Sequence, residues 1–140
     1  MAQFFVIILC PMIFLGTGKP EPLLDLQVSN IKHDKGSIMV AIYDHPDKFL
    51  KDVAVFTTTY PVDVAGSVHI PVNGLRPGEY AVSVFHDVND NGKLDKNFLG
   101  IPTEPYGFSN NVKGTFGPPK FADAKFTTIQ DKHRVEIKLY

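Results

Sequence analysis

Short segments in which apolar and polar residues alternate, separated by turn residues, most strongly constrain the fold of this chain. The alternation runs over Leu24–Val28, over Val68–Val72 and again over Val135–Leu139. A period of two turns one face of each segment toward a core, as in half-buried β-strands. Eleven glycines and eleven prolines supply the breaks, and no stretch has the pattern of a helix of ordinary length. We therefore predict an all-β fold, an antiparallel β-sandwich of about seven strands.

Other segments refine this prediction. The run Ile38–Tyr43 is apolar on both faces, which indicates a strand in the middle of a sheet. Pro71 has no N–H to donate, so its strand is expected at an edge. Asp47 is expected to cap a single helical turn. From Asp87 to Lys120 there is little strand pattern. A loop of that length is expected to be functional, to be fixed by another group, or to contain an element that the pattern does not reveal.

The N-terminus predicts export. Residues Phe4–Leu15 form an apolar run that is shorter than the roughly 20 residues needed to span a bilayer, and small residues follow at Gly16 and Gly18. We predict a signal peptide over residues 1–18 and a single domain over 19–140, placed in the periplasm, at the cell surface or outside the cell. A buried N-terminal strand or an uncleaved anchor is the alternative. Lipidation of Cys10 is not favoured, because bulky residues precede it.

Size and charge exclude several classes of function. A chain of 140 residues forms one domain with a real core. Its net charge is −1, with acids and bases interspersed, so no electrostatic signature of a nucleic-acid partner or an anionic membrane is visible. We also expect no membrane span in the mature chain. Cleavage after the signal removes the single cysteine, and stability must then come from core packing, with or without a metal ion, rather than from disulfides.

The segment His86–Asp95 has the spacing of a calcium loop. Calcium takes six to eight oxygen ligands, so a chain wrapped around one ion offers an oxygen at every second residue. Gly92 stands where such a loop turns sharply. The predicted ligands are the side chains of Asp87, Asn89, Asn91 and Asp95 and the backbone carbonyl of Lys93.

The expected affinity is low, about 10⁻⁴ to 10⁻³ M, as in extracellular calcium modules. Only two of the four side chains are carboxylates, and Phe98 occupies the position where an EF-hand has a bidentate glutamate. A strand, not a helix, precedes the loop. A further carboxylate from Glu104, Asp44 or Asp47 would help to complete the shell.

A metal-free turn is the competing interpretation. Asn91-Gly92 is a strong signal for a type I′ hairpin turn, and Asn or Asp side chains can satisfy turn backbones by themselves. His86, beside Asp87, is the only histidine of interest. It either orients that carboxylate or is a partly buried residue at the end of a strand.

The segment Glu104–Asn111 mixes aromatic and amide side chains. Exposed on a loop, Tyr106, Phe108 and Asn110 would bind a sugar or a peptide by stacking and hydrogen bonding. The alternative is that the aromatics anchor the long loop onto its own sandwich. Ser109 lies in no nucleophile elbow, and no base can be assigned to it.

Two stretches resemble known families. Leu75–Tyr80 (LRPGEY) resembles the final hairpin of transthyretin-like sandwiches, including bacterial surface B-repeats and carboxypeptidase accessory domains. Gly78–Asn111, followed by "GPPKFADAKF" at Gly117–Phe126, is similar to the bacterial family named domain of unknown function 2141. This resemblance covers about residues 24–140. It implies an exported bacterial protein with a transthyretin-like or immunoglobulin-like sandwich, and it supplies no catalytic residues.

These observations predict a non-enzymatic exported module whose long loop is ordered by calcium. A carbohydrate- or peptide-binding accessory domain, with an unknown protein or glycan as its partner, is the second hypothesis. A hydrolase is the third, and it requires a cavity that His86 or an acid of the loop faces.

Overall fold

The computed structural model describes residues 24–129 and 132–140. The predicted signal peptide, its alternatives and Cys10 lie outside the described residues, as does the start of the predicted domain. Among the described residues, no helix has the length and apolar character needed to cross a membrane.

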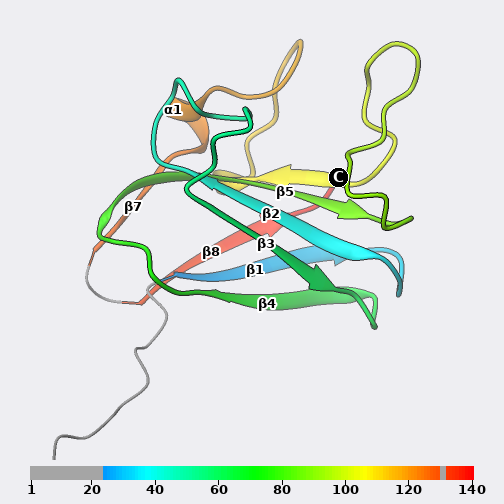
Figure 1. Ribbon diagram of the computed structural model, residues 1–140, viewed down its shortest axis with the longest axis horizontal. Helices are drawn as coiled ribbons and strands as arrows, with labels where there is room; N and C mark the ends of the chain where they lie inside the picture. The colour runs from blue at the N-terminus through cyan, green and yellow to red at the C-terminus, as the bar shows by residue number, and fades with distance from the viewer. Residues whose placement is uncertain (1–23, 130–131) are drawn as a thin grey trace, which may run out of the picture.

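The described residues contain eight strands in two sheets; Figure 1 shows their arrangement. The smaller sheet has the order β4 (Gly66–Val72), β1 (Leu24–Ile31), β8 (His133–Lys138). The larger sheet has the order β3 (Phe56–Pro61), β2 (Ser37–Tyr43), β5 (Gly78–Asp87), β6 (Tyr106–Phe108), and β7 (Phe126–Thr128) pairs with the start of β5. The described residues include two short helices, the 3₁₀ helix η1 (Ser109–Asn111) and α1 (Phe121–Ala124).

The predicted all-β sandwich is confirmed in its main features. β2 lies between β3 and β5, as its two apolar faces indicated, and β4, which contains Pro71, is an edge strand. The prediction of a wholly antiparallel sandwich was wrong at one pairing, because β1 and β8 run parallel, with Leu26 opposite Val135. Alternation within a strand does not report the direction of its neighbour, so the parallel pairing could not be predicted from the pattern.

The main core lies between the two sheets and draws its residues from strands of both. Alternation places one apolar face of each strand in this space. In a strand, alternate side chains face opposite sides of the sheet, so burial of one set turns the other set outward. The buried members are Leu24, Leu26, Val28, Ile31, Ile38, Val40, Ile42, Val62, Ile70, Val72, Tyr80, Val82, Val84, Val135, Ile137 and Leu139.

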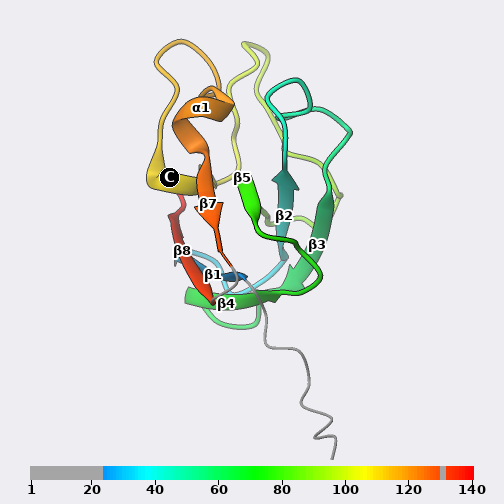
Figure 2. The same ribbon diagram turned by 90° about the vertical axis from the view of Figure 1, so that its left-hand side faces the viewer.

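The outer face of the larger sheet is only partly covered. Three connections rise from this sheet on the side away from the smaller one: residues 44–55, 88–105 and 109–125 (Figures 1 and 2). The first and third cover one end of the face with a second apolar cluster, which contains Tyr43, Phe49, Ala81, Phe108, Phe121 and Ala124. The rest of the face stays open.

One local prediction was wrong, and one alternative that the sequence left open was confirmed. Residues 45–51 form successive turns and no helix; the N–H of Lys48 bonds the carbonyl of His45 at 3.1 Å, and Asp47 caps nothing. The long segment after Asp87 does contain an element, the three-residue strand β6 that pairs with Ser83–Phe85. Three residues are too few to show a period of two.

The turn between β1 and β2 generates a test of the fold. Gly36 has φ +76°, and a Cβ there would overlap the carbonyl of Asp87 and lie 2.8 Å from Cα of Val88. Gly74 has a similar φ of +81° but no atom within 4 Å of that position. We expect Gly36→Ala to lower the free energy of unfolding by at least about 2 kcal/mol more than Gly74→Ala, measured by urea denaturation. Equal losses would contradict the close packing of this turn on the end of β5.

Candidate cation-binding loop

The loop begins with a buried carboxylate. Asp87 is the last residue of β5 and only 1% exposed. Its Oδ1 accepts the N–H of Asn91 at 3.1 Å, and its Oδ2 accepts the N–H of Gly92 at 2.6 Å. A buried charge must be matched by hydrogen-bond donors or by an opposite charge. Here the donors come from the backbone four and five residues ahead, so the chain is folded back onto the carboxylate.

A second carboxylate, that of Asp95, accepts hydrogen bonds from the two amide side chains of the loop. Asn89 Nδ2 donates to Asp95 Oδ2 at 2.7 Å, and Asn91 Nδ2 donates to both Asp95 oxygens at 2.9 and 3.1 Å. These donors, Asn91 first and then Asn89, together with the positive charge of Lys93, lower the pKa of Asp95 below its ordinary value. Asp95 is therefore held in its charged form.

The amide oxygens face the backbone. Asn91 Oδ1 accepts the N–H of Lys93 at 2.9 Å, and Asn89 Oδ1 accepts the N–H of Asn91 at 3.3 Å. Asn91 thus connects both carboxylates, through its N–H to Asp87 and through its side chain to Asp95. The structure brings the four predicted ligand side chains into one network, which Lys93 joins through its N–H.

Glu104 closes the loop from outside. It is 9% exposed; its Oε1 accepts the N–H of Val88 at 2.9 Å, and its Oε2 accepts the N–H of Asp95 at 3.1 Å. The other two acids considered for the ion shell lie elsewhere, in the 44–55 connection, where Asp44 pairs with Lys48 and Asp47 with His45. One carboxylate therefore fixes both ends of the 87–95 loop.

The turn is not of type I′. Such a turn needs positive φ at both central residues, and of Asn91 and Gly92 only Gly92, at +77°, has it. The metal-free interpretation also predicted that Asp and Asn side chains would satisfy the turn backbone. This is what the structure shows, because their oxygens accept the N–H groups of Asn91 and Lys93. These bonds close the loop without an ion. Among the described residues, no group of three or more His, Cys, Asp and Glu gathers as a metal site, so an ion here would depend on the amides.

His86 has a structural role. Its side chain is fully buried, and Nε2 lies 2.7 Å from the carbonyl of Lys35, which makes Nε2 the donor. Nδ1 has no partner among the described residues. The ring therefore fixes the turn between β1 and β2, and it does not orient Asp87.

The proposed stacking residues are mostly used for packing. Phe108 is 8% exposed and packs edge-on against Phe49, with ring centroids 6.3 Å apart. Asn110 donates its amide to the carbonyls of Asp123 and Lys125, at 3.1 and 2.8 Å. Tyr106 is half-buried against Phe108. Phe108 is thus buried and not available for stacking, whereas Asn110 is exposed but uses its NH₂ group to anchor the long loop on the sandwich.

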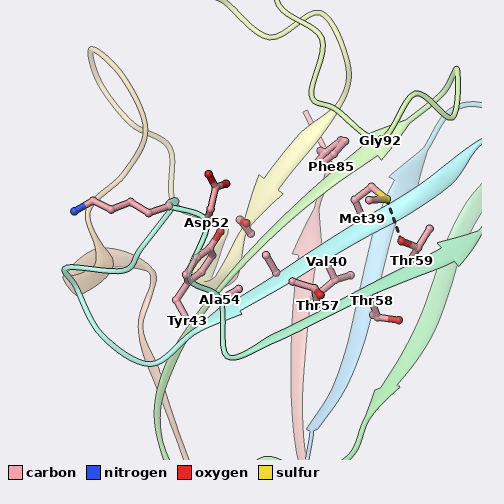
Figure 3. Close-up of a pocket in the computed structure, with 13 residues that line it drawn as sticks. Met39, Val40, Tyr43, Asp52, Ala54, Thr57, Thr58, Thr59, Phe85 and Gly92 are labelled. Atoms are coloured by element: carbon pink, nitrogen blue, oxygen red, sulfur yellow. Dashed lines mark hydrogen bonds between the residues drawn. The ribbon is translucent and has the colours of Figure 1, made fainter.

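The open part of the larger sheet's outer face is hollowed. One hollow of about 830 Å³ lies over Met39, Thr57 and Phe85 (Figure 3), and an adjoining one of about 790 Å³ extends to Tyr106 and Phe116. The sequence pattern does not predict these hollows, because the outward residues of a strand have the same pattern whether the face is flat or concave. Neither hollow is lined by His86 or by the acids of the 87–95 loop.

Glu104 gives a test of how the loop is held. In Glu104→Gln one acceptor oxygen becomes an NH₂ group that faces a backbone N–H. We expect the free energy of unfolding to fall by about 1–2 kcal/mol and the amide hydrogens of Val88 and Asp95 to exchange faster with solvent. Glu136→Gln, at an exposed position of β8, is the matched control. Unchanged exchange at both amides would contradict the role given to Glu104.

Asp95 gives a test by pH. Because its pKa is lowered in the folded state, its contribution to stability is fully present above the ordinary value of 3.8 and is lost as the pH falls through the lower, folded value. Carboxyl NMR titration should show Asp95 titrating below 3.8, and Asn91→Ala, which removes the largest cause, should raise the midpoint. A midpoint of Asp95 that Asn91→Ala leaves unchanged would contradict the assigned cause.

One family model matches most of the chain. Residues 26–137 match the family model described as "Uncharacterized protein conserved in bacteria (DUF2141)", a match that runs from β1 to β8 and includes the loop. No curated protein and no solved structure matches the chain. The transthyretin-like resemblance stays a prediction, whereas the predicted family is confirmed: the chain belongs to the bacterial DUF2141 family.

Proposed function

We propose that this chain is an exported, non-enzymatic β-sandwich domain whose 87–95 loop binds one calcium ion weakly. The observation that carries the proposal is the convergence of Asn89 and Asn91 on the carboxylate of Asp95. Three of the predicted ligands meet at one point, while Asp87 holds the turn that brings them there.

The charge of the loop supports a cation. Asp87, Asp95 and Glu104 form no ion pair with a Lys, Arg or His in the described part of the chain, although two of them are buried. A half-turn of each Asn side-chain amide exchanges its NH₂ group and its oxygen. The oxygens of Asn89 and Asn91 would then face an ion beside Asp95, and oxygen is the ligand that calcium takes.

Few carboxylates and an existing hydrogen-bond network both weaken the site. The ion must compete with the bonds that close the loop in its absence, so we keep the expected dissociation constant at about 10⁻⁴ to 10⁻³ M. Such an affinity suits an exported protein, and the apolar run before Gly16 supports export. The proposal of a non-enzymatic domain is supported by the lining of the two hollows, which contains neither His86 nor the acids of the 87–95 loop.

Calorimetry and thermal melting with calcium test the proposal. At a calcium concentration ten times the dissociation constant, binding stabilises the folded state by about 1.4 kcal/mol, which raises the melting temperature by about 3–8 °C. Asp95→Asn keeps the shape of the side chain and removes its charge, so we expect it to abolish both signals. Asp63→Asn, on an exposed residue between β3 and β4, makes the same charge change and should keep them.

Three results would decide against calcium. The first is no heat of binding and no shift of melting temperature at about 10 mM calcium. The second is an equal response from Asp95→Asn and the unsubstituted protein. The third is an equal loss from Asp63→Asn, which would indicate non-specific screening. In each case the loop is a turn that its own side chains complete.

A further inference from the structure

Two neighbouring loop tips expose large apolar side chains to solvent. Phe98 is 95% exposed and Leu99 67% at one tip, with Ile101 exposed beside them; Phe116 is fully exposed at the other. Both tips line the 790 Å³ hollow and rise on the same side of the larger sheet (Figures 1 and 2). Exposed apolar groups gathered at one place mark a surface that meets a partner or a membrane.

The first tip is fixed in its exposed position. The N–H of Asn97 bonds the carbonyl of Ile101 at 2.9 Å, and the side-chain oxygen of Asn97 accepts the N–H groups of Leu99 and Ile101 at 2.9 and 3.1 Å. A bridge between Lys96 and Pro102 continues this small hairpin. The apolar side chains therefore point outward from a tip that is hydrogen-bonded within itself.

The second tip is also tightly turned. Gly114 packs against the carbonyl of Gly117, where a Cβ would not fit, and Pro118-Pro119 follow. Phe116 lies between these glycines, so a tight turn directs it into solvent. Both loops thus hold large apolar side chains away from the core.

The charges at the tips are all positive. Residues 96–101 and 112–120 contain Lys96, Lys113 and Lys120 and no acid. Lys96 and Lys120 are exposed and form no ion pair within the described residues; Lys113 Nζ lies 3.6 Å from the ring centroid of Tyr140. This positive charge is confined to the tips, because Asp95 directly precedes the first of them.

We propose that the two tips dock the domain on an anionic phospholipid surface, with Phe98, Leu99 and Phe116 entering the interface and the lysines contacting phosphates. Lysine next to apolar side chains is the composition of interfacial anchors. A protein partner would need a separate pocket for each protruding ring, whereas a fluid lipid interface conforms to both. The site needs no spanning segment and no calcium, so it stands apart from the proposal for the 87–95 loop.

Co-sedimentation with vesicles of equimolar phosphatidylglycerol and phosphatidylethanolamine tests the proposal, with a calcium chelator present throughout. We expect the protein comprising residues 19–140 to sediment with these vesicles and not with phosphatidylcholine vesicles. Phe98→Ser and Phe116→Ser should each weaken binding about tenfold, and the double variant more. Val64→Ser, which removes a 71% exposed side chain between β3 and β4, is the matched control and should bind normally.

Because the exchanged side chains are exposed, the variants should keep the melting temperature of the parent protein. No sedimentation of the parent protein with the anionic vesicles would overturn the proposal. So would a double variant that binds as well as its parent, or a Val64→Ser variant that loses as much. Self-association that depends on Phe98 and Phe116 and occurs without vesicle binding would assign the tips to a second copy of the chain instead.

Discussion

A carboxylate buried at the end of a central strand governs the long loop of this protein. Asp87 cannot reach water and finds its donors in the backbone of Asn91 and Gly92. Burial of an ionised group without such donors costs several kcal/mol, so the chain after β5 has little freedom at this point. The turn at Gly92, the approach of the two asparagines to Asp95 and the path of the following hairpin all start from this requirement.

Glu104 complements this arrangement from the far end of the same segment. Glu104 accepts the N–H groups of Val88 and Asp95 and so holds the two ends of the loop, its neck, together. Directly beyond it, the carbonyl of Pro105 accepts the N–H of His86 in β5. A segment with little secondary structure is thus fixed by two acids and not by a core of its own. The residues beyond the neck, from Lys96 to Ile101, are free to present apolar side chains outward.

The sequence predicted those parts of the fold whose signal is local and periodic. The alternation at Leu24–Val28 and Val135–Leu139 located two strands, and the spacing from Asp87 to Asp95 located the loop network. What it could not predict depends on neighbours distant in the chain. The parallel pairing of β1 with β8 and the short strand β6 depend on partner strands that lie far away in the sequence, and a local pattern does not identify those partners. The choice of Glu104 over Asp44 likewise follows from the path of the chain in space.

The position of β8 has a consequence for how the domain is made. β1 lies in the middle of the smaller sheet, between β4 and the last strand of the chain, and the Leu24–His133 pair joins residues from opposite ends of the domain. Contacts between residues so far apart are slow to form, since a long stretch must be ordered first. Until β8 has been synthesised, one edge of β1 has no native partner. The smaller sheet is therefore completed late, after all the strands that precede β8 in the chain are already present.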